Sequence, residues 1–319
     1  MWRGAAGVLV MAVAGLGSVP AAVAQGATGE AVIIEGLAGT MLRPAGATAG
    51  VVIISGSGPT DRDGNSKAGL KTDAYKQLGE ALANAGIATL RFDKRGVGES
   101  LKDKAGATLT EDNITIQTAA ADVATLSAWM GKQPGITRVV LAGHSEGGLV
   151  ALVAAKSAKV DRVVLMTVAG QPLGALLRKQ FARQPIPEPV NEEIERVLVA
   201  LETGKETGPM KPPVDQIFRT GVQPFMRSVL KLDPVPLVKE VTVPILAIGG
   251  GADMQVGRFD FDPLVAARPG VVGHWEARLS HVLKEAIDDG ESQVKAYTDP
   301  SVPLAKGMVE AVVRFVKGT

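Results

Sequence analysis

The chain has 319 residues, and 46% of them are hydrophobic, which is enough for the core of one large α/β domain or two small ones. Lys and Arg number 34 and Asp and Glu 33, so the charge is balanced and indicates no nucleic-acid or polyanion partner. The sequence contains no cysteine, which excludes disulfides, a thiolate nucleophile, thiolate metal ligands and a lipidated N-terminal cysteine.

The first 24 residues have the pattern of a signal peptide. Met1-Trp2-Arg3 is a short basic start, residues 4–16 are apolar and uncharged, and Ala22-Val23-Ala24 fits a cleavage site. A membrane anchor is the competing interpretation, but the uninterrupted apolar run is short for a bilayer span. We therefore expect cleavage after Ala24, no stable membrane anchor, and a periplasmic or secreted protein that begins at Gln25.

After this leader, apolar segments alternate with helix patterns. An opening hairpin is expected at residues 31–35 and 40–43. A continuous apolar run at residues 51–54 is typical of a strand buried on both faces, and further strands are expected at residues 87–92, 139–142, 162–168, 243–248 and 271–277. Helices are expected at residues 73–85, 119–130 and 304–316. The alternation predicts an α/β fold with a mostly parallel central sheet covered by helices on both faces.

Residues 171–240 interrupt this alternation. They contain one strong helix pattern at residues 191–201, with Asn191 expected as its N-cap and Gly204 at its end, and many prolines elsewhere. We interpret the segment as a helical cap over the site. The alternative is a solvated connection without function, which is uncommon at this length. The expected organisation is thus a core in two parts, residues 25–170 and 241–319, with the cap between them.

The most informative motif is Gly143-His144-Ser145-Glu146-Gly147, between the strand at residues 139–142 and an apolar helix pattern from Leu149. A G-x-S-x-G turn between a strand and a helix is the nucleophile elbow, which exposes the serine hydroxyl above the sheet. Chance is the alternative explanation, because 38 residues are glycine. The flanking strand and helix favour Ser145 as a nucleophile.

A serine nucleophile needs a histidine base, and the chain has three histidines. His144 is inside the elbow and is expected to point away from the hydroxyl. His274 lies in the middle of a strand, where a packed histidine is the default. His281 follows the last strand, as the order serine, acid, histidine requires. His281 is therefore the predicted base.

The expected acid is Asp253, which follows the strand at residues 243–248 and three glycines. Asp260 and Asp262 are rivals, and a lone aspartate after glycines is often only a turn former. For the oxyanion, we expect the backbone N–H of Glu146 and, from the loop after the strand at residues 51–54, that of Ser57.

Four motifs together resemble bacterial exported serine esterases of the α/β-hydrolase superfamily, of the dienelactone-hydrolase-like or serine-aminopeptidase-like branch. The motifs are Ser-Gly-Ser-Gly-Pro-x-Asp-Arg-Asp-Gly-Asn from residue 55, Arg-Phe-Asp-Lys-Arg-Gly-Val-Gly-Glu-Ser from residue 91, Gly-His-Ser-Glu-Gly-Gly from residue 143, and Asp-Met-Gln-Val from residue 253. The resemblance covers residue 31 to the C-terminus except the cap. It implies the α/β-hydrolase fold and hydrolysis of small acyl esters through an acyl-enzyme, without metal or cofactor. Ser55 departs from the His-Gly pair that opens the oxyanion loop in many relatives.

Other functions remain open at this point. A thioesterase or a serine peptidase or amidase would use the same triad, because the leaving group is chosen by the cap and the pocket. A non-catalytic binding protein on this fold would lack a triad member, and all three are present. Few large apolar residues in the cap, among them Phe181, Phe218, Phe225 and Met226, favour short acyl chains. The oligomeric state is not indicated.

Overall fold

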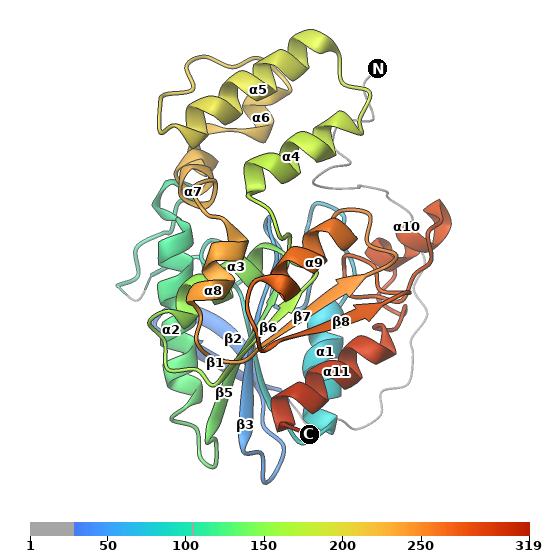
Figure 1. Ribbon diagram of the computed structural model, residues 1–319. Coiled ribbons are helices and arrows are strands. Elements are labelled where there is room, and N and C mark those ends of the chain that lie inside the picture. The colour runs from blue at the N-terminus through green and yellow to red at the C-terminus, as the bar shows by residue number, and fades with distance from the viewer. Residues whose placement is uncertain (1–28, 104) are drawn as a thin grey trace.

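The computed structural model describes residues 29–103 and 105–319. At its centre is an eight-stranded sheet with the order β1-β2-β4-β3-β5-β6-β7-β8 (Figure 1). The strands are β1 (Glu30–Ile34), β2 (Leu37–Leu42), β3 (Ala49–Ile54), β4 (Ala88–Phe92), β5 (Arg138–His144), β6 (Arg162–Met166), β7 (Ile245–Gly250) and β8 (Val271–Glu276). The β1–β2 and β2–β4 pairs are antiparallel and the other five pairs are parallel. The mostly parallel sheet is confirmed, whereas the expected signal peptide lies outside the described residues.

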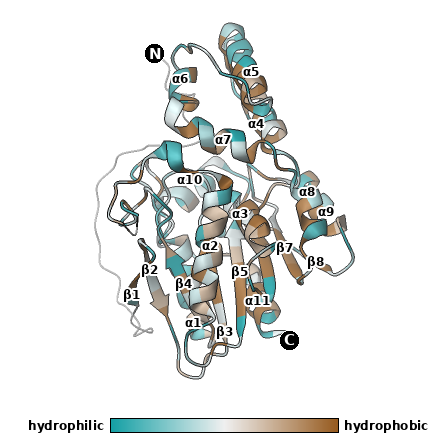
Figure 2. Ribbon diagram, turned by 90° about the vertical axis from the view of Figure 1, so that its left-hand side faces the viewer, coloured by the Kyte–Doolittle hydropathy of each residue, from teal (hydrophilic) through white to brown (hydrophobic). Residues whose placement is uncertain are grey.

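Helices cover both faces of the sheet, as expected. The helices that pack around it are α1 (Ala74–Asn84), α2 (Ile116–Met130), α3 (Glu146–Ala155), α8 (Pro234–Glu240), α9 (Arg258–Ala266) and α11 (Lys306–Lys317). Val51 and Ile53 of β3 pack with α1 and α11, while Val52 and Ile54 pack with α2, α3 and α8. This alternation is the period of two that a strand imposes on its side chains. Both faces of the central strands are thus buried, and β5 and β7 are largely hydrophobic in Figure 2.

Four helices form a separate layer above one end of the sheet (Figure 1). We call residues 173–230 the helical lobe; it contains α4 (Leu173–Ala182), α5 (Glu188–Glu202), α6 (Val214–Ile217) and α7 (Gln223–Val229). The lobe has its own apolar cluster, made of Leu177, Phe181, Ile194, Val197, Leu198, Leu201, Val214, Phe218 and Leu230. By contrast, α8 packs on α3 with the main core. The lobe is therefore shorter than the insertion outlined from the sequence.

One local expectation was wrong, and two helices were not anticipated. Helix α5 begins at Glu188, so Asn191 lies inside the helix and is not its N-cap. Pro189 occupies the first turn, where a missing N–H costs nothing because those amides have no intrahelical partner. Asp260 and Asp262 lie on helix α9, and neither α9 nor α10 (Gly290–Thr298) was anticipated. Among the described residues, no helix combines the length and the apolar character needed to cross a bilayer.

Candidate active site

The nucleophile elbow connects β5 to α3. Ser145 has φ 51° and ψ −121°, a strained conformation for a residue with a side chain. A Cβ atom at Gly143 would overlap the Gly147 carbonyl, and one at Gly147 would lie 2.5 Å from the Ile54 carbonyl oxygen. Only glycine therefore fits at either position. The close packing of β5, α3 and the end of β3 holds the serine in its turn.

Strand register brings the other site loops to the same edge of the sheet. Ile54, the last residue of β3, is paired with Gly143, so the loop that follows β3 starts beside the elbow. Met166 at the end of β6 accepts a hydrogen bond from Ser145 N–H at 2.9 Å and is paired with Ile248 of β7. The loop that carries Asp253 follows β7 directly. This is the carboxyl edge of parallel strands, where α/β sheets place their sites.

Ser145, His281 and Asp253 are brought together in one hydrogen-bonded chain. His281 Nε2 lies 3.2 Å from Ser145 Oγ, and His281 Nδ1 lies 2.9 Å from Asp253 Oδ2. The side chain of Asp253 is fully buried, and that of His281 is 7% exposed. A carboxylate can only accept, so Nδ1 carries the proton and Nε2 presents its lone pair to the hydroxyl. That is the arrangement that activates a serine.

Backbone groups hold Asp253 in place. Its Oδ1 accepts hydrogen bonds from Gln255 N–H at 2.7 Å and Val256 N–H at 2.9 Å. The loop of Asp253 is also joined to the loop of His281, because Ala252 N–H donates to the Leu279 carbonyl at 3.2 Å. One carboxylate oxygen is thus fixed by the main chain, and the other is left for the imidazole.

The two rival aspartates have other partners. Asp260 is buried, where it accepts from Gln171 Nε2 at 2.6 Å and from Gly257 N–H at 3.2 Å, at the start of α9. Burial raises the pKa of Asp260. Asp262 forms an ion pair with Arg258 at 3.0 Å on the outside of the same helix. Asp253 is the member of this group that reaches His281.

His144 anchors the site without touching Ser145 Oγ. Its Nε2 lies 2.7 Å from the carbonyl oxygen of His281, and its Nδ1 lies 2.7 Å from the hydroxyl of Tyr75. The carbonyl only accepts, so Nε2 carries the proton and Nδ1 accepts from Tyr75. Burial, and then the charge of His281, lower the pKa of His144 to about 3. His144 therefore stays neutral in a fixed tautomer. The third histidine, His274, pairs with Glu276 at 3.4 Å.

Two main-chain donors at the site are unpaired. In the part of the chain that the structure describes, the N–H groups of Glu146, the first residue of α3, and of Ser57 have no hydrogen-bond partner. The dipole of α3 adds partial positive charge at Glu146. Gly56 N–H, in contrast, donates to the Tyr75 hydroxyl at 2.9 Å. The free pair has the composition of an oxyanion hole.

Tyr75 and Lys94 are two residues of the site region that sequence reasoning did not find. Lys94 belongs to the motif that begins at residue 91, to which no role was assigned, and Tyr75 lies on α1. Lys94 Nζ donates to the Gly56 carbonyl at 2.5 Å. Burial lowers the pKa of Lys94 and raises that of Glu146, while the charge of each opposes the shift of the other. For Lys94, the sequence signal that could have found it is its position just after a strand, at the edge of the sheet where the site lies.

Ion pairs brace the surrounding loops. Asp93 accepts from Arg62 N–H at 2.7 Å and Glu99 N–H at 2.9 Å, and pairs with the Arg62 guanidinium at 3.0 Å. Arg95 makes a bidentate pair with Asp122 of α2, both contacts at 2.6 Å. The Arg62–Asp93 contacts connect the loop after β3 to the loop after β4, and the Arg95–Asp122 pair fixes the loop after β4 to α2.

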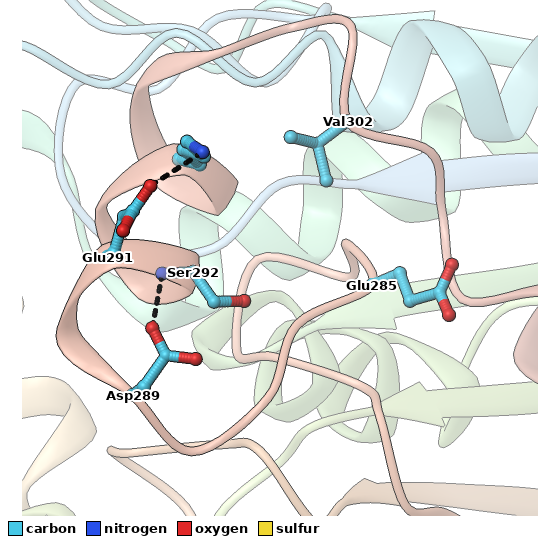
Figure 3. A pocket seen from close by; sticks show the side chains of 6 residues that line it. Glu285, Asp289, Glu291, Ser292 and Val302 are labelled. Carbon is cyan, nitrogen blue, oxygen red and sulfur yellow. Dashed lines mark hydrogen bonds and ion pairs between the residues drawn. The ribbon is translucent and has the colours of Figure 1, made fainter.

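A hollow of about 280 Å³ lies elsewhere, beside α10 (Figure 3). It is lined by Glu285, Asp289, Glu291, Ser292, Lys295 and Val302. Dashed lines in Figure 3 mark local contacts of two of its acidic side chains: Asp289 accepts from Ser292 N–H at 2.7 Å, and Glu291 pairs with Lys295 at 2.8 Å. No triad residue lines it. Within the described residues, no group of three or more His, Asp or Glu side chains is arranged to hold a metal ion.

Comparisons with known proteins agree with this architecture. Residues 51–285 match the model of the alpha/beta hydrolase family. Esterase EstD of Thermotoga maritima is 28% identical over 235 residues, which cover 72% of this chain and 53% of EstD, so the chain spans about half of that relative.

Solved structures show the same fold at low identity. The alpha/beta hydrolase GrgF from Penicillium sp. is 15% identical, with a TM-score of 0.59 over 91% of this chain and 98% of GrgF. Est1E from Butyrivibrio proteoclasticus is 16% identical, with a TM-score of 0.54 over 92% of this chain and 98% of Est1E.

Proposed function

The chain belongs to the α/β-hydrolase family, and from that premise we propose that it is a serine esterase that cleaves small carboxylic esters through an acyl-enzyme. The observation that carries the proposal is the chain from Ser145 Oγ through His281 to Asp253, with contacts of 3.2 and 2.9 Å. The esterase relative supports the choice of ester over other acyl substrates. A non-catalytic protein would have no need of this arrangement.

The proposed acylation begins when Ser145 Oγ attacks the acyl carbon of the ester and His281 Nε2 takes the hydroxyl proton. Asp253 stabilises the imidazolium through Nδ1–H, and the N–H groups of Ser57 and Glu146 stabilise the oxyanion. The C–O bond to the alcohol then breaks, and His281 gives its proton to the departing oxygen. Ser145 is left acylated.

Deacylation repeats the same steps with water. His281 Nε2 takes a proton from a water molecule while the oxygen of that water attacks the acyl carbon. The bond between the acyl group and Ser145 Oγ breaks, and the proton passes to Oγ, which releases the carboxylic acid. The chain's own groups supply every proton transfer in both halves.

We propose short acyl chains as the preferred substrates. The large apolar side chains that the lobe contains are mostly used in its own cluster: Phe218 is 1% and Phe181 7% exposed. Few remain to line a long apolar groove. The small number of large apolar residues in the sequence of the cap favours short acyl chains as well.

The experiment is a substrate panel: p-nitrophenyl acetate, butyrate and palmitate, a butyryl thioester and an aminoacyl p-nitroanilide, each with the wild type and Ser145→Ala. We expect the highest kcat/KM for the two short esters and its loss in the variant. A higher kcat/KM for the anilide or the thioester would make the protein an amidase or a thioesterase. No turnover of any member would make it a binding protein.

We also propose that the protein is bacterial, of the exported branch named above, and that it is periplasmic or secreted after cleavage behind Ala24. The basic start, the apolar run and Ala22-Val23-Ala24 support this. Intact mass of the protein from the periplasm or medium should correspond to a chain that begins at Gln25. A full-length chain in the cytosol would contradict the proposal.

A further inference from the structure

The Gly56–Ser57 peptide has two polar ends with different partners. A trans peptide directs its C=O and N–H to opposite sides. The carbonyl oxygen, which belongs to Gly56, accepts from Lys94 Nζ at 2.5 Å. The N–H, which belongs to Ser57, has no partner within the described residues. Whatever orients the carbonyl therefore also orients the free donor.

Gly56 is held on its other side as well. Its N–H donates to the Tyr75 hydroxyl at 2.9 Å, and Tyr75 is tied through His144 to the carbonyl of His281. A Cβ atom at Gly56 would lie 2.9 Å from His144 Nδ1, so this backbone has no room to shift toward the histidine. Tyr75 and Lys94 thus determine the orientation of Gly56 between them.

We propose that Lys94 is a positioning residue of the oxyanion hole. Its ammonium group holds the Gly56 carbonyl so that Ser57 N–H faces the oxyanion formed on attack by Ser145, and its charge polarises the same peptide and strengthens that donor. The inference rests on the esterase function proposed above and assigns a role to a residue outside the triad.

A cation is a costly choice for a purely structural contact. Lys94 is half-buried, and a partly desolvated ammonium is costly unless its interactions compensate. Its hydrogen-bond partner in the described chain is the Gly56 carbonyl. Two titratable groups nearby interact electrostatically with Lys94. The Glu146 carboxylate favours the charged form of Lys94, and the charge of Lys94 helps to keep His144 neutral. A charge that strengthens a transition-state donor gives this arrangement a catalytic purpose.

The test compares Lys94→Met, which keeps the aliphatic stem, Lys94→Gln, which keeps a donor without charge, and Lys94→Arg. The control is Arg95→Met, which removes the neighbouring ion pair with Asp122 but leaves Gly56 untouched. Each is assayed for kcat and KM on p-nitrophenyl butyrate and on its thiono analogue, in which sulfur replaces the carbonyl oxygen. Sulfur accepts hydrogen bonds poorly, and the intrinsic reactivities of the two esters are the same for every variant. A change in the ratio of the two rates between a variant and the wild type therefore reports on the oxyanion donors.

For Lys94→Met we expect kcat to fall by about 10- to 100-fold, less than the loss of a whole oxyanion donor, with KM nearly unchanged. The preference for the oxo ester over the thiono ester should shrink in parallel. Lys94→Gln should be intermediate, Lys94→Arg should recover most of kcat, and Arg95→Met should keep the wild-type preference.

An unchanged oxo-to-thiono preference in both Lys94→Met and Lys94→Gln would overturn the proposal, whatever happens to stability. If Lys94→Met does not fold, Lys94→Gln gives the same decision. Failure of the esterase proposal looks different: the wild type itself would then hydrolyse neither ester.

Discussion

The triad region and the helical lobe are positioned in different ways. Ser145 and Asp253 stand at the ends of β5 and β7, whose places are set by the register of a buried parallel sheet. The lobe is organised around its own apolar cluster. It also contacts the core: Val229 packs in the main apolar cluster, and Arg183 donates to the Met254 carbonyl at 3.2 Å. The difference teaches that the lobe could change its packing without moving the strands that carry Ser145 and Asp253.

The largest effect should come from Ser145→Ala. Because it removes the nucleophile, kcat for p-nitrophenyl butyrate should fall by about 10⁴-fold or more, as loss of a triad member does elsewhere. The thermal midpoint should stay close to that of the wild type. Ser157→Ala, an exposed serine just after α3, is the matched control. Near-normal turnover by folded Ser145→Ala would show that Ser145, at this edge of the sheet, is not the nucleophile.

Asp253→Asn should come next. The amide favours the wrong tautomer of His281, so kcat should fall by about 10⁴-fold while the fold is kept. Asp260→Asn is the control: Asp260, on α9, accepts from Gly257 N–H and Gln171 Nε2, so its change should affect stability and cost far less kcat. If Asp260→Asn or Asp262→Asn proves the crippling change and Asp253→Asn the mild one, the acid lies on α9.

Phe218→Ala sharpens the comparison from the side of the lobe. Phe218 is 1% exposed in the lobe cluster, and truncation of a buried Phe costs about 3–5 kcal/mol. Hydrogen exchange should accelerate in residues 173–230 but not in the sheet, and kcat for the acetate ester should remain near the wild-type value. Val199→Ala, at an exposed position on α5, is the control. A kcat loss comparable to that of Asp253→Asn would show that the lobe positions the chemistry.

The smallest effect concerns pH and His144. Its pKa is about 3 in the folded protein against 6.5 in the reference state, so below about pH 6.5 the unfolded chain binds a proton that the folded chain does not. The wild type should lose about 1.4 kcal/mol per pH unit from this group as pH falls from about 6.5 toward 3. His144→Gln can make both hydrogen bonds but cannot titrate, so this part of the acid sensitivity should disappear.

Urea unfolding at pH 7, 6 and 5 gives the free energy of unfolding of the wild type and of His144→Gln at each pH. His274→Gln is the control, because His274 lies outside the hydrogen-bond chain. If the free energy of unfolding falls equally with pH in the wild type and in His144→Gln, His144 is not held neutral.

Much of the fold was predictable because each element has a local cause. Continuous apolar runs such as Val51–Ile54 indicate doubly buried strands, and the glycines around Ser145 indicate a turn that tolerates no Cβ. Candidates for the triad followed from residue type and from order along the chain. The structure then distinguished Asp253 from Asp260, because the choice depends on where each side chain points.

The rest could not be predicted because it depends on contacts distant in sequence. Tyr75 reaches Gly56 across 19 residues and Lys94 across 38, and neither pairing leaves a periodic signal. Asn191 was misassigned as an N-cap because Pro189 was interpreted as a helix breaker, although the first turn accepts proline. Helix α9, which contains Pro263, was not anticipated.

The central claim is that Ser145 is a nucleophile activated by His281 and Asp253. A fluorophosphonate probe tests it most directly, because it forms a covalent bond to an activated serine without knowledge of the substrate. After incubation with the probe, peptide mass analysis should place one adduct per chain on Ser145, and Ser145→Ala and Asp253→Asn should show none or far slower labelling. An adduct on another serine, or no adduct on folded wild-type protein, would contradict the account.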